Sequence, residues 1–222
     1  MPYKLTNRNV LVTGGSRGLG EVICLKFAAE GCNVAINYVS SEDKARELKK
    51  RIEEEWGVKV VCLKGDMSQE SDCISVVKET IKEFGGLDII VSNAGYTRFS
   101  NFADLSAPTA EDWQKCYATN VVAQTFLLKE ALPTFQANEE GGSFIMTSSI
   151  AGVGAGGSCM PYSVTKAAQL HLMKCLAATQ GPKGKKYSEE DQERLKDRAF
   201  LKQVVNGSRR LCPSICGYRE KQ

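Results

Sequence analysis

The chain lacks the features typical of membrane, secreted and nucleic-acid-binding proteins. No uninterrupted apolar run approaches the roughly 20 residues that a membrane helix needs, and the N-terminus lacks the apolar core of a secretory signal. The net charge is only +3 over 222 residues, and Lys and Arg are interleaved with Asp and Glu. No strong electrostatic field therefore favours nucleic acid. We expect a cytoplasmic protein with neither a membrane nor a nucleic-acid partner.

We expect the cysteines to form neither a disulfide framework nor a metal site. Their number, nine, is odd, and most stand alone within apolar segments, as Cys24, Cys62 and Cys116 do. Small buried thiols of this kind are typical of a reducing compartment. The close pair Cys212 and Cys216 has no His nearby, and a zinc site needs more ligands than that stretch offers. We expect no metal.

The chain does contain short β-branched runs that alternate with polar helices carrying an apolar stripe, which indicates β-α units. The runs 10–12 and 89–91 are apolar at successive positions, so helices should cover both faces of the sheet. We predict the α/β class and a Rossmann-type doubly wound parallel sheet, with its ligand at the carboxyl ends of the strands. The expected strands are Asn9–Thr13, Asn33–Tyr38, Lys59–Lys64, Leu87–Ser92 and Ser143–Ser148; the expected helices are Gly18–Glu30, Glu42–Trp56, Glu70–Phe84, Glu111–Gln136 and Met160–Ala178.

A glycine-rich turn, TGGSRGLG at 13–20, stands between the first expected strand and helix. Glycines permit a tight turn and let the backbone approach a pyrophosphate, whose charge is met by free N–H groups at the start of the helix. An ordinary β-α turn is the alternative, but the strand-turn-helix setting favours dinucleotide binding. The expected contacts are Gly14, Ser16, Arg17, Gly18, Leu19 and Gly20.

The end of the second expected strand bears on the choice of dinucleotide. It lacks the acidic residue that would bind a ribose 2′-hydroxyl, whereas Arg17 and Ser40 could hold a 2′-phosphate. NADP is therefore expected in preference to NAD, unless Arg17 is only a solvated surface charge. The next two strands are followed by further expected contacts: Asp66, Met67, Asn93, Ala94 and Gly95. Asp66 could instead cap the next helix, and Asn93 is expected to stabilise the sheet as well.

Tyr162 and Lys166 are four residues apart and therefore share one face of the fifth expected helix. A tyrosine, with its ordinary pKa of about 10, transfers protons poorly at neutral pH, and a neighbouring cation stabilises its phenolate. Such pairs are common on helices. This pair, however, follows Ser149 at the end of the fifth expected strand by thirteen residues, and Asn120 lies in the helix before that strand.

In their order along the chain, TGGSRGLG, SNAG, the Asn120 of TNVV, TSS and YSVTK resemble the classical short-chain dehydrogenase/reductases. The resemblance covers about residues 6–183 and is nearest to NADP-dependent reductases of 3-oxoacyl thioesters, sugars, polyols and ketones. It implies a small carbonyl or alcohol substrate. Tyr162 would be the proton donor or acceptor, and Ser149, with Ser148 as second choice, would bind the substrate oxygen. Lys166 would favour the phenolate and hold the nicotinamide ribose, and Asn120 would fix a water.

The sequence departs from the family pattern after residue 183. The family continues with a sixth strand of the form RVNxVxPG, but no strand-like run is evident in 184–222. We expect 1–183 to form an NADP-binding domain that holds the catalytic residues. Residues 184–222 should form a charged tail with a helix at about 188–203. The fifth strand would then be an exposed sheet edge.

Three functions follow from this departure. The first is an NADP(H)-dependent oxidoreductase. The second is a catalytically impaired, C-terminally altered form that only binds the cofactor or pairs with a partner through helices 111–136 and 160–178, which the resemblance implicates in oligomers. The third is a product that does not fold stably.

Overall fold

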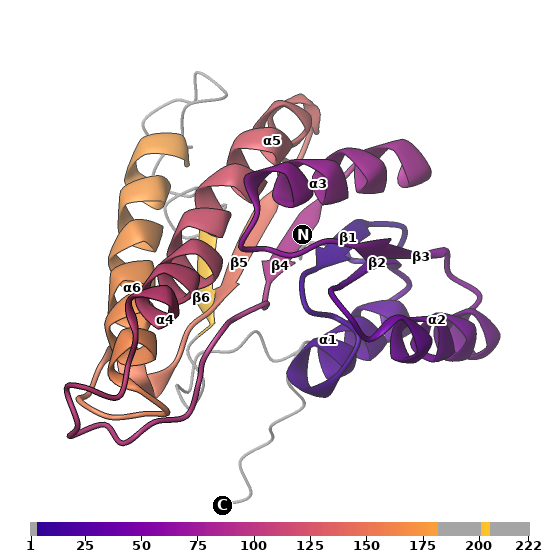
Figure 1. Cartoon of the computed structure of the whole chain (residues 1–222). Helices are drawn as coiled ribbons and strands as arrows, with labels where there is room; N and C mark the ends of the chain where they lie inside the picture. The colour runs from indigo at the N-terminus through magenta and orange to yellow at the C-terminus, as the bar shows by residue number, and fades with distance from the viewer. Residues whose placement is uncertain (1–3, 182–200, 205–222) are drawn as a thin grey trace, which may run out of the picture.

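The computed structural model describes residues 4–181 and 201–204, which form a six-stranded parallel sheet with helices on both faces (Figure 1). The strand order is β3-β2-β1-β4-β5-β6. The first three strands are added toward one edge of the sheet and the last three toward the other, so the strand order reverses between β1 and β4. The strands are β1 Asn9–Val12, β2 Asn33–Tyr38, β3 Val60–Lys64, β4 Ile89–Ser92, β5 Ser143–Thr147 and β6 Leu201–Val204. The helices are α1 Gly18–Ala29, α2 Glu42–Trp56, α3 Glu70–Phe84, α4 Ala110–Tyr117, α5 Ala123–Ala137 and α6 Met160–Gln180, with a π-helical turn η1 at Ala118–Val122 and a 3-10 turn η2 at Ile150–Gly152.

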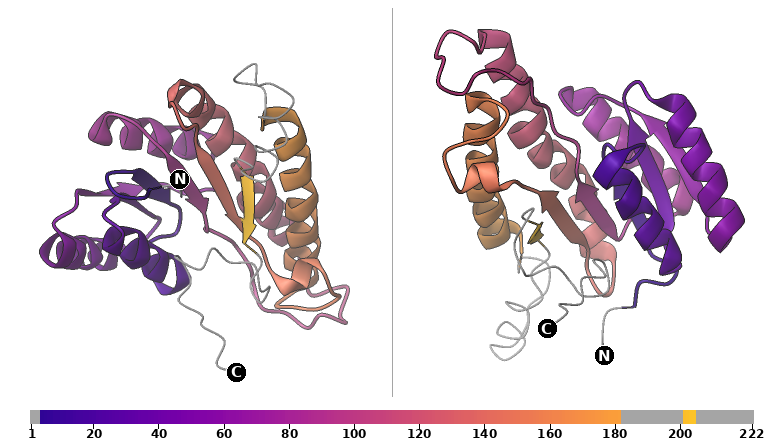
Figure 2. Two further views of the ribbon diagram at one scale, coloured as in Figure 1. Left: turned by 180° about the vertical axis from the view of Figure 1, so that it is seen from behind. Right: turned by 90° about the horizontal axis from the view of Figure 1, so that it is seen from below.

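Helices cover β1 on both faces, as its continuous apolar run predicts. Val10 and Val12 pack in the cluster that contains Phe27 of α1 and Leu48 of α2. Leu11 packs in the opposite cluster, with side chains of α3 and α5. Figure 2 shows the same division, with α1 and α2 on one face and α3, α5 and α6 on the other. The doubly wound parallel sheet is therefore confirmed.

The helix expected at 111–136 is interrupted. The π-helical turn η1, residues 118–122, lies between α4 and α5, and both helices join it directly without a loop. A π turn inserts one extra residue into the helix, which shifts the faces of the two parts relative to each other. The 3.6-residue pattern of the sequence therefore predicts the helix but not this turn.

Two expectations for the segment beyond residue 183 are wrong. Residues 201–204 form a strand rather than the end of a helix, and this strand pairs in parallel with residues 144–147 of β5 (Figure 2, yellow). The fifth strand is therefore not an exposed edge along these residues. The expected helical residues 188–200 lie outside the part of the chain that the structure describes.

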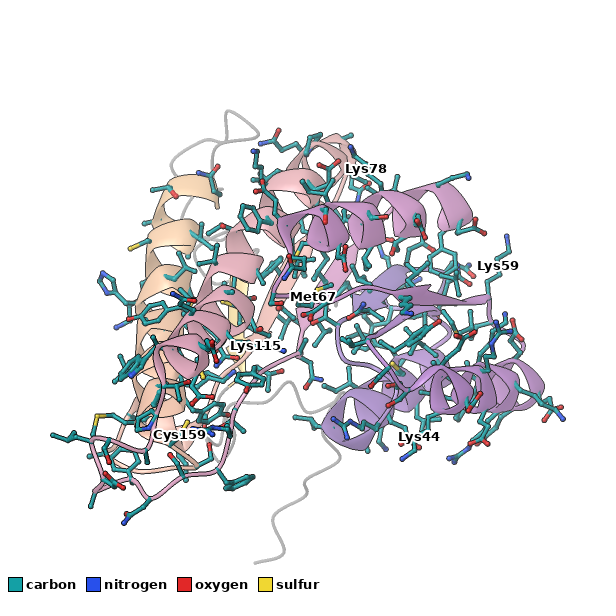
Figure 3. All side chains as sticks on the ribbon, in the orientation of Figure 1. Lys44, Lys59, Met67, Lys78, Lys115 and Cys159 are labelled. Carbon is teal, nitrogen blue, oxygen red and sulfur yellow. The ribbon has the colours of Figure 1, made fainter. Side chains whose placement is uncertain are left out.

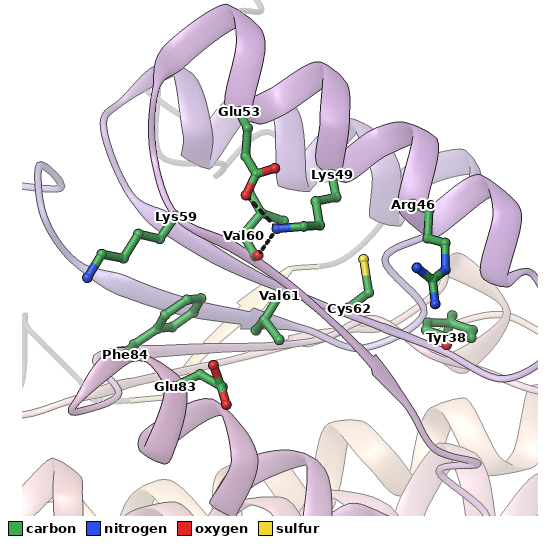
Figure 4. Close-up of a pocket in the computed structure, with 10 residues that line it drawn as sticks. All are labelled: Tyr38, Arg46, Lys49, Glu53, Lys59, Val60, Val61, Cys62, Glu83 and Phe84. Atoms are coloured by element: carbon green, nitrogen blue, oxygen red, sulfur yellow. Dashed lines mark hydrogen bonds and ion pairs between the residues drawn. The ribbon is translucent and has the colours of Figure 1, made fainter.

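The other edge of the sheet is β3, and a lysine of α2 covers part of it. The Nζ atom of Lys49 donates a hydrogen bond to the carbonyl oxygen of Val60 at 2.6 Å and also pairs with Glu53 (Figure 4). A cavity of about 480 Å³ along this edge is lined by Lys49 and Glu53 and by Cys62 and Phe84. A charged side chain that satisfies an outward carbonyl makes an edge strand less able to pair with another chain.

Candidate functional site

A cleft of about 470 Å³ lies at the carboxyl ends of β1, β2, β3 and β4. This is the place where a doubly wound sheet binds its ligand, because the strand order reverses there. Figure 3 labels two side chains that line it, Met67 after β3 and Lys115 of α4. All twelve residues expected to contact a dinucleotide outside α6 line this one cleft: Gly14, Ser16, Arg17, Gly18, Leu19, Gly20, Ser40, Asp66, Met67, Asn93, Ala94 and Gly95.

The glycine-rich turn depends on residues without a side chain. Gly14 and Gly18 have φ angles of +61° and +57°, a region that other residues rarely adopt. A Cβ atom on Gly20 would lie 2.1 Å from the carbonyl oxygen of Gly14, so only glycine lets α1 begin so close to the turn. A Cβ atom on Gly18 would meet no atom within 4 Å, which leaves the start of α1 open to a ligand. Arg17 is exposed at the N-cap of this helix.

Asn37, the last residue but one of β2, is a lining residue that the sequence interpretation missed. It is 1% exposed, and its Oδ1 accepts a hydrogen bond from the Gly14 N–H at 3.1 Å. Its Nδ2 donates to the carbonyl oxygens of Leu63 and Gly65. One amide thus ties the turn after β1 to the end of β3. The available signal was an asparagine, a residue that strands disfavour, within an otherwise apolar run.

Asn93 has the structural role that was expected for it. Its Nδ2 donates to the carbonyl oxygens of Thr13 and Gly14 at 3.2 and 3.3 Å. The backbone N–H groups of Asn93 and Ala94 both donate to the Thr13 hydroxyl at 3.0 Å. The ends of β1 and β4 are therefore held together directly beneath the cleft.

Asp66 does not cap α3, which was one interpretation of it. The N-cap of α3 is Gln69, and the Asp66 carboxylate instead accepts a hydrogen bond from the Ser68 N–H at 2.8 Å. This bond shapes the turn after β3 and leaves Asp66 on the wall of the cleft. Six further lining residues were not expected: Tyr38, Val39, Ser41, Tyr96, Lys115 and Thr119.

Lys166 and Tyr162 lie together on α6, as their spacing predicts. The Nζ atom of Lys166 is 5.6 Å from the centroid of the Tyr162 ring. Lys166 is 3% exposed, and its Nζ donates to the carbonyl oxygen of Thr147 at 2.7 Å and to Oε1 of Gln169 at 3.2 Å. Burial lowers the pKa of Lys166 from its ordinary 10.5 to about 8, because a low-dielectric surrounding disfavours the ammonium form.

Asn120 lies in the π-helical turn and is fully buried. Its side chain accepts from the Tyr96 N–H at 2.8 Å and donates to the Tyr96 carbonyl oxygen and to Thr165 Oγ1, each at 3.0 Å. It therefore connects the loop after β4 to α6, one residue before Lys166. A Cβ atom on Gly95 would lie 3.3 Å from Asn120 Oδ1 and 3.8 Å from Lys166 Nζ, so this glycine keeps the two residues close.

The two adjacent serines after β5 differ in their surroundings. Ser149 is half-buried and caps the 3-10 turn, and its Oγ accepts from the Ala151 N–H at 3.2 Å. None of the described residues accepts a hydrogen bond from this hydroxyl. Ser148 is 3% exposed, and its hydroxyl has no hydrogen-bond partner within the described residues. The structure thus brings Asn120, Ser149, Tyr162 and Lys166 to the carboxyl end of β5, beside the cleft.

The sequence model of the short chain dehydrogenase family matches residues 8–185. The chain belongs to the short-chain dehydrogenase family. Among curated members, it is 40% identical over 82% of its length to an uncharacterized oxidoreductase, YghA, of Escherichia coli. It is 38% identical over 81% of its length to the hydroxynaphthalene reductase arp2 of Aspergillus fumigatus. The match covers 60% and 63% of these two relatives, so the chain spans only part of their length.

Solved short-chain dehydrogenases share the fold. A short-chain dehydrogenase from Burkholderia cenocepacia in complex with NADP superimposes with a TM-score of 0.73 at 32% identity, over 82% of this chain and 72% of that one. A blue fluorescent protein from a metagenomic library in complex with NADPH gives 0.73 at 27% identity, over 80% and 70%. NAD⁺-bound xylitol dehydrogenase, at 24% identity, has the same fold with a TM-score of 0.72.

The described residues offer neither a membrane span nor a cluster of metal ligands. No helix among them is long and apolar enough to cross a membrane. Within the same residues, no group of three or more His, Cys, Asp or Glu side chains is placed to hold a metal ion.

Proposed function

We propose that the chain is an NADP(H)-dependent oxidoreductase that transfers a hydride between nicotinamide and a carbonyl or secondary alcohol. One observation carries the proposal. A buried ammonium, that of Lys166, lies beside the Tyr162 ring at the end of β5, and no carboxylate among the described residues pairs with it. A charge buried without a counterion is costly, so it indicates a site built for chemistry rather than for stability.

The cleft fits a dinucleotide. The open start of α1 and the positive φ angles of Gly14 and Gly18 suit a pyrophosphate. Arg17 and Ser40, both on the wall of the cleft, are the residues that we assign to the 2′-phosphate of NADP. When bound, the nicotinamide supplies or takes the hydride. The chain's residues then have to orient the substrate and move one proton.

Tyr162 is the residue that we assign to this proton. In reduction its phenol donates the proton to the substrate oxygen, and in oxidation its phenolate takes the proton back. The Lys166 ammonium stabilises the phenolate electrostatically. Ser149, whose hydroxyl proton is free, donates a hydrogen bond to the substrate oxygen. Because Ser148 is buried, the structure supports Ser149 for this role over Ser148.

Asn120 is proposed to return the proton through a water. Its side-chain amide is occupied by Tyr96 and Thr165, so the main-chain carbonyl of Asn120 would hold that water. Gln124 Nε2 also donates a long hydrogen bond to this carbonyl, at 3.4 Å.

The decisive test measures binding and turnover separately on the purified full chain. Quenching of NADPH fluorescence reports binding, and NADPH oxidation with ketones and 3-oxoacyl thioesters reports turnover. We expect Tyr162→Phe to lower kcat by at least about 100-fold while NADPH binding is retained. Tyr117→Phe, on the exposed face of α4, is the matched control and should leave kcat unchanged. Full turnover by Tyr162→Phe would contradict the assignment.

The preference for NADP over NAD has its own test. Arg17→Ala should weaken binding of NADP by about 10-fold, the loss of one charge-assisted contact, and leave NAD binding nearly unchanged. Arg51→Ala, an exposed arginine of α2 paired with Glu55, is the control. Equal losses for both dinucleotides would remove Arg17 from the 2′-phosphate site.

A binding or dimerising protein without turnover is the second candidate. It is favoured by the lining of the cleft, which includes the dinucleotide residues but neither Ser149 nor Tyr162. Tyr117, Val122 and Val164 of α4, η1 and α6 are each 40% exposed and would supply apolar area to a partner copy. NADPH binding without turnover, together with a dimer in analytical ultracentrifugation, would favour this candidate.

A further inference from the structure

Gln169 is a buried glutamine whose side chain makes one hydrogen bond to the described residues. It lies on α6, three residues after Lys166 and seven after Tyr162, so all three side chains share one face of the helix. It is 1% exposed, and its Oε1 accepts the hydrogen bond from Lys166 Nζ at 3.2 Å. Its Nε2 has no hydrogen-bond partner among the described residues.

Such a side chain is costly in a core. An unpartnered buried amide loses its hydrogen bonds to water, whereas Met or Leu at the same position would not. Within the described part of the chain, the contact with Lys166 is the interaction that offsets this cost. The geometry therefore indicates that Gln169 serves the lysine and not the packing of the helix.

The surroundings of the Lys166 ammonium show what that contact does. Its neighbours are the Thr147 carbonyl oxygen from β5, Gln169 from α6 and Gly95 from the loop after β4, all neutral. The titratable group beside it is Tyr162. An ammonium has three N–H donors, and two of them are used by Thr147 and Gln169. These two bonds fix the direction of the third, which is left for a ligand.

We propose that Gln169 is a positioning residue, whose carboxamide oxygen keeps Lys166 charged and directs its free N–H toward the cofactor side of the site. The role of this positioning in catalysis rests on the proposed function, whereas the hydrogen bond from Lys166 to Gln169 and its effect on the charge of Lys166 do not. A neutral acceptor suits this task because it stabilises the ammonium without forming an ion pair that would compete with the phenolate of Tyr162.

Titration of Lys166 tests the proposal without cofactor or turnover. The protein is produced with lysine labelled with carbon-13 at Cε, and the Lys166 NMR signal is assigned by its loss in Lys166→Arg. The chemical shift of this signal is then followed against pH. Gln169→Met, which keeps the length but removes the acceptor, should lower the midpoint by roughly one pH unit, and Gln169→Glu should raise it by a similar amount. A role in packing alone would not give shifts of opposite sign.

Gln124→Met is the matched control, because Gln124 is also a buried glutamine but contacts Asn120 instead of Lys166. It should leave the Lys166 midpoint unchanged. Midpoints for Gln169→Met and Gln169→Glu that both fall within about 0.2 units of the native value, or that move in the same direction, would overturn the proposal.

Turnover gives an independent arm of the test. In a chain that reduces ketones, Gln169→Met should move the alkaline loss of kcat to lower pH by the same amount as the midpoint, with little change in KM. If the native chain shows no turnover, the proposed function fails, and the carbon-13 titration still decides the role of Gln169.

Discussion

The burial of Lys166 should make the stability of the folded chain depend on pH in the alkaline range. The pKa of its buried ammonium falls from 10.5 to about 8. At about 1.4 kcal/mol per pKa unit, this difference disfavours the charged folded form by about 3 kcal/mol. In Lys166→Met the carbonyl of Thr147 and the carboxamide of Gln169 each lose a hydrogen bond, which costs about 1–3 kcal/mol apiece. These losses offset much of the gain, so at pH 7 the two chains should differ in stability by no more than about 3 kcal/mol.

The pH dependence of this stability difference tests the argument more directly than its size at any one pH. In the unfolded chain Lys166 stays protonated up to about pH 10.5, whereas in the folded chain it loses its proton near pH 8. Between these values the unfolded state binds more protons, so the native chain gains stability relative to the variant as pH rises. Below pH 8 both states are protonated and the difference is constant. The stability of Lys166→Met relative to the native chain should thus fall by about 3 kcal/mol between pH 8 and pH 10.5.

Urea unfolding followed by circular dichroism at pH 7, 8, 9 and 10, without cofactor, measures this. Both chains carry Tyr162→Phe, because Lys166 lies beside that phenol, and the contributions of the thiols and the other tyrosines then cancel when the two chains are subtracted. Lys44→Met, which replaces an exposed lysine of α2, should show a difference that does not vary with pH. A constant difference for Lys166→Met as well would refute the argument that burial lowers the pKa of this lysine.

Three further outcomes follow from the structure. Gly20→Ala should lower the free energy of unfolding in urea by about 1–3 kcal/mol and weaken NADPH binding, because the new Cβ would collide with the Gly14 carbonyl; native stability would contradict this. Thr109→Ala should cost about 1 kcal/mol in the same assay, since it removes the capping box of α4; an unchanged midpoint would show that the cap is dispensable. Iodoacetamide at pH 8 should label Cys175, which is exposed, far faster than Cys24, whose pKa is raised by burial; peptide mass spectrometry would show equal rates if burial did not protect Cys24.

The elements of the fold could be predicted because their signals are local. The strands at 9–12 and 33–38 are marked by successive apolar residues, and the helices at 42–56 and 70–84 by an apolar stripe. The strand at 201–204 could not, because LKQV is short and half polar. Its conformation is established by pairing with β5, and strand formation depends more on neighbours than on intrinsic preference.

The same contrast holds for the candidate site. Glycines and a Tyr–Lys pair at a fixed spacing are visible in the sequence, and the structure brings them to one end of the sheet. Asn37 and Gln169 are not visible as site residues, because their importance lies in contacts with residues far along the chain or buried beside them. Lys115 likewise lines the cleft over the ring of Tyr96, a contact that no local pattern specifies.

Thr147 connects the unusual end of the chain to the proposed chemistry. Its carbonyl oxygen holds Lys166, and its hydroxyl donates to Oδ1 of Asn93, at 3.5 Å, beneath the cleft. In the register of the sheet, Thr147 lies directly opposite Val204 of β6. Movement of residues 201–204 along β5 would therefore act on the residue that positions the lysine. Residues 201–204 are for this reason part of the support of the site.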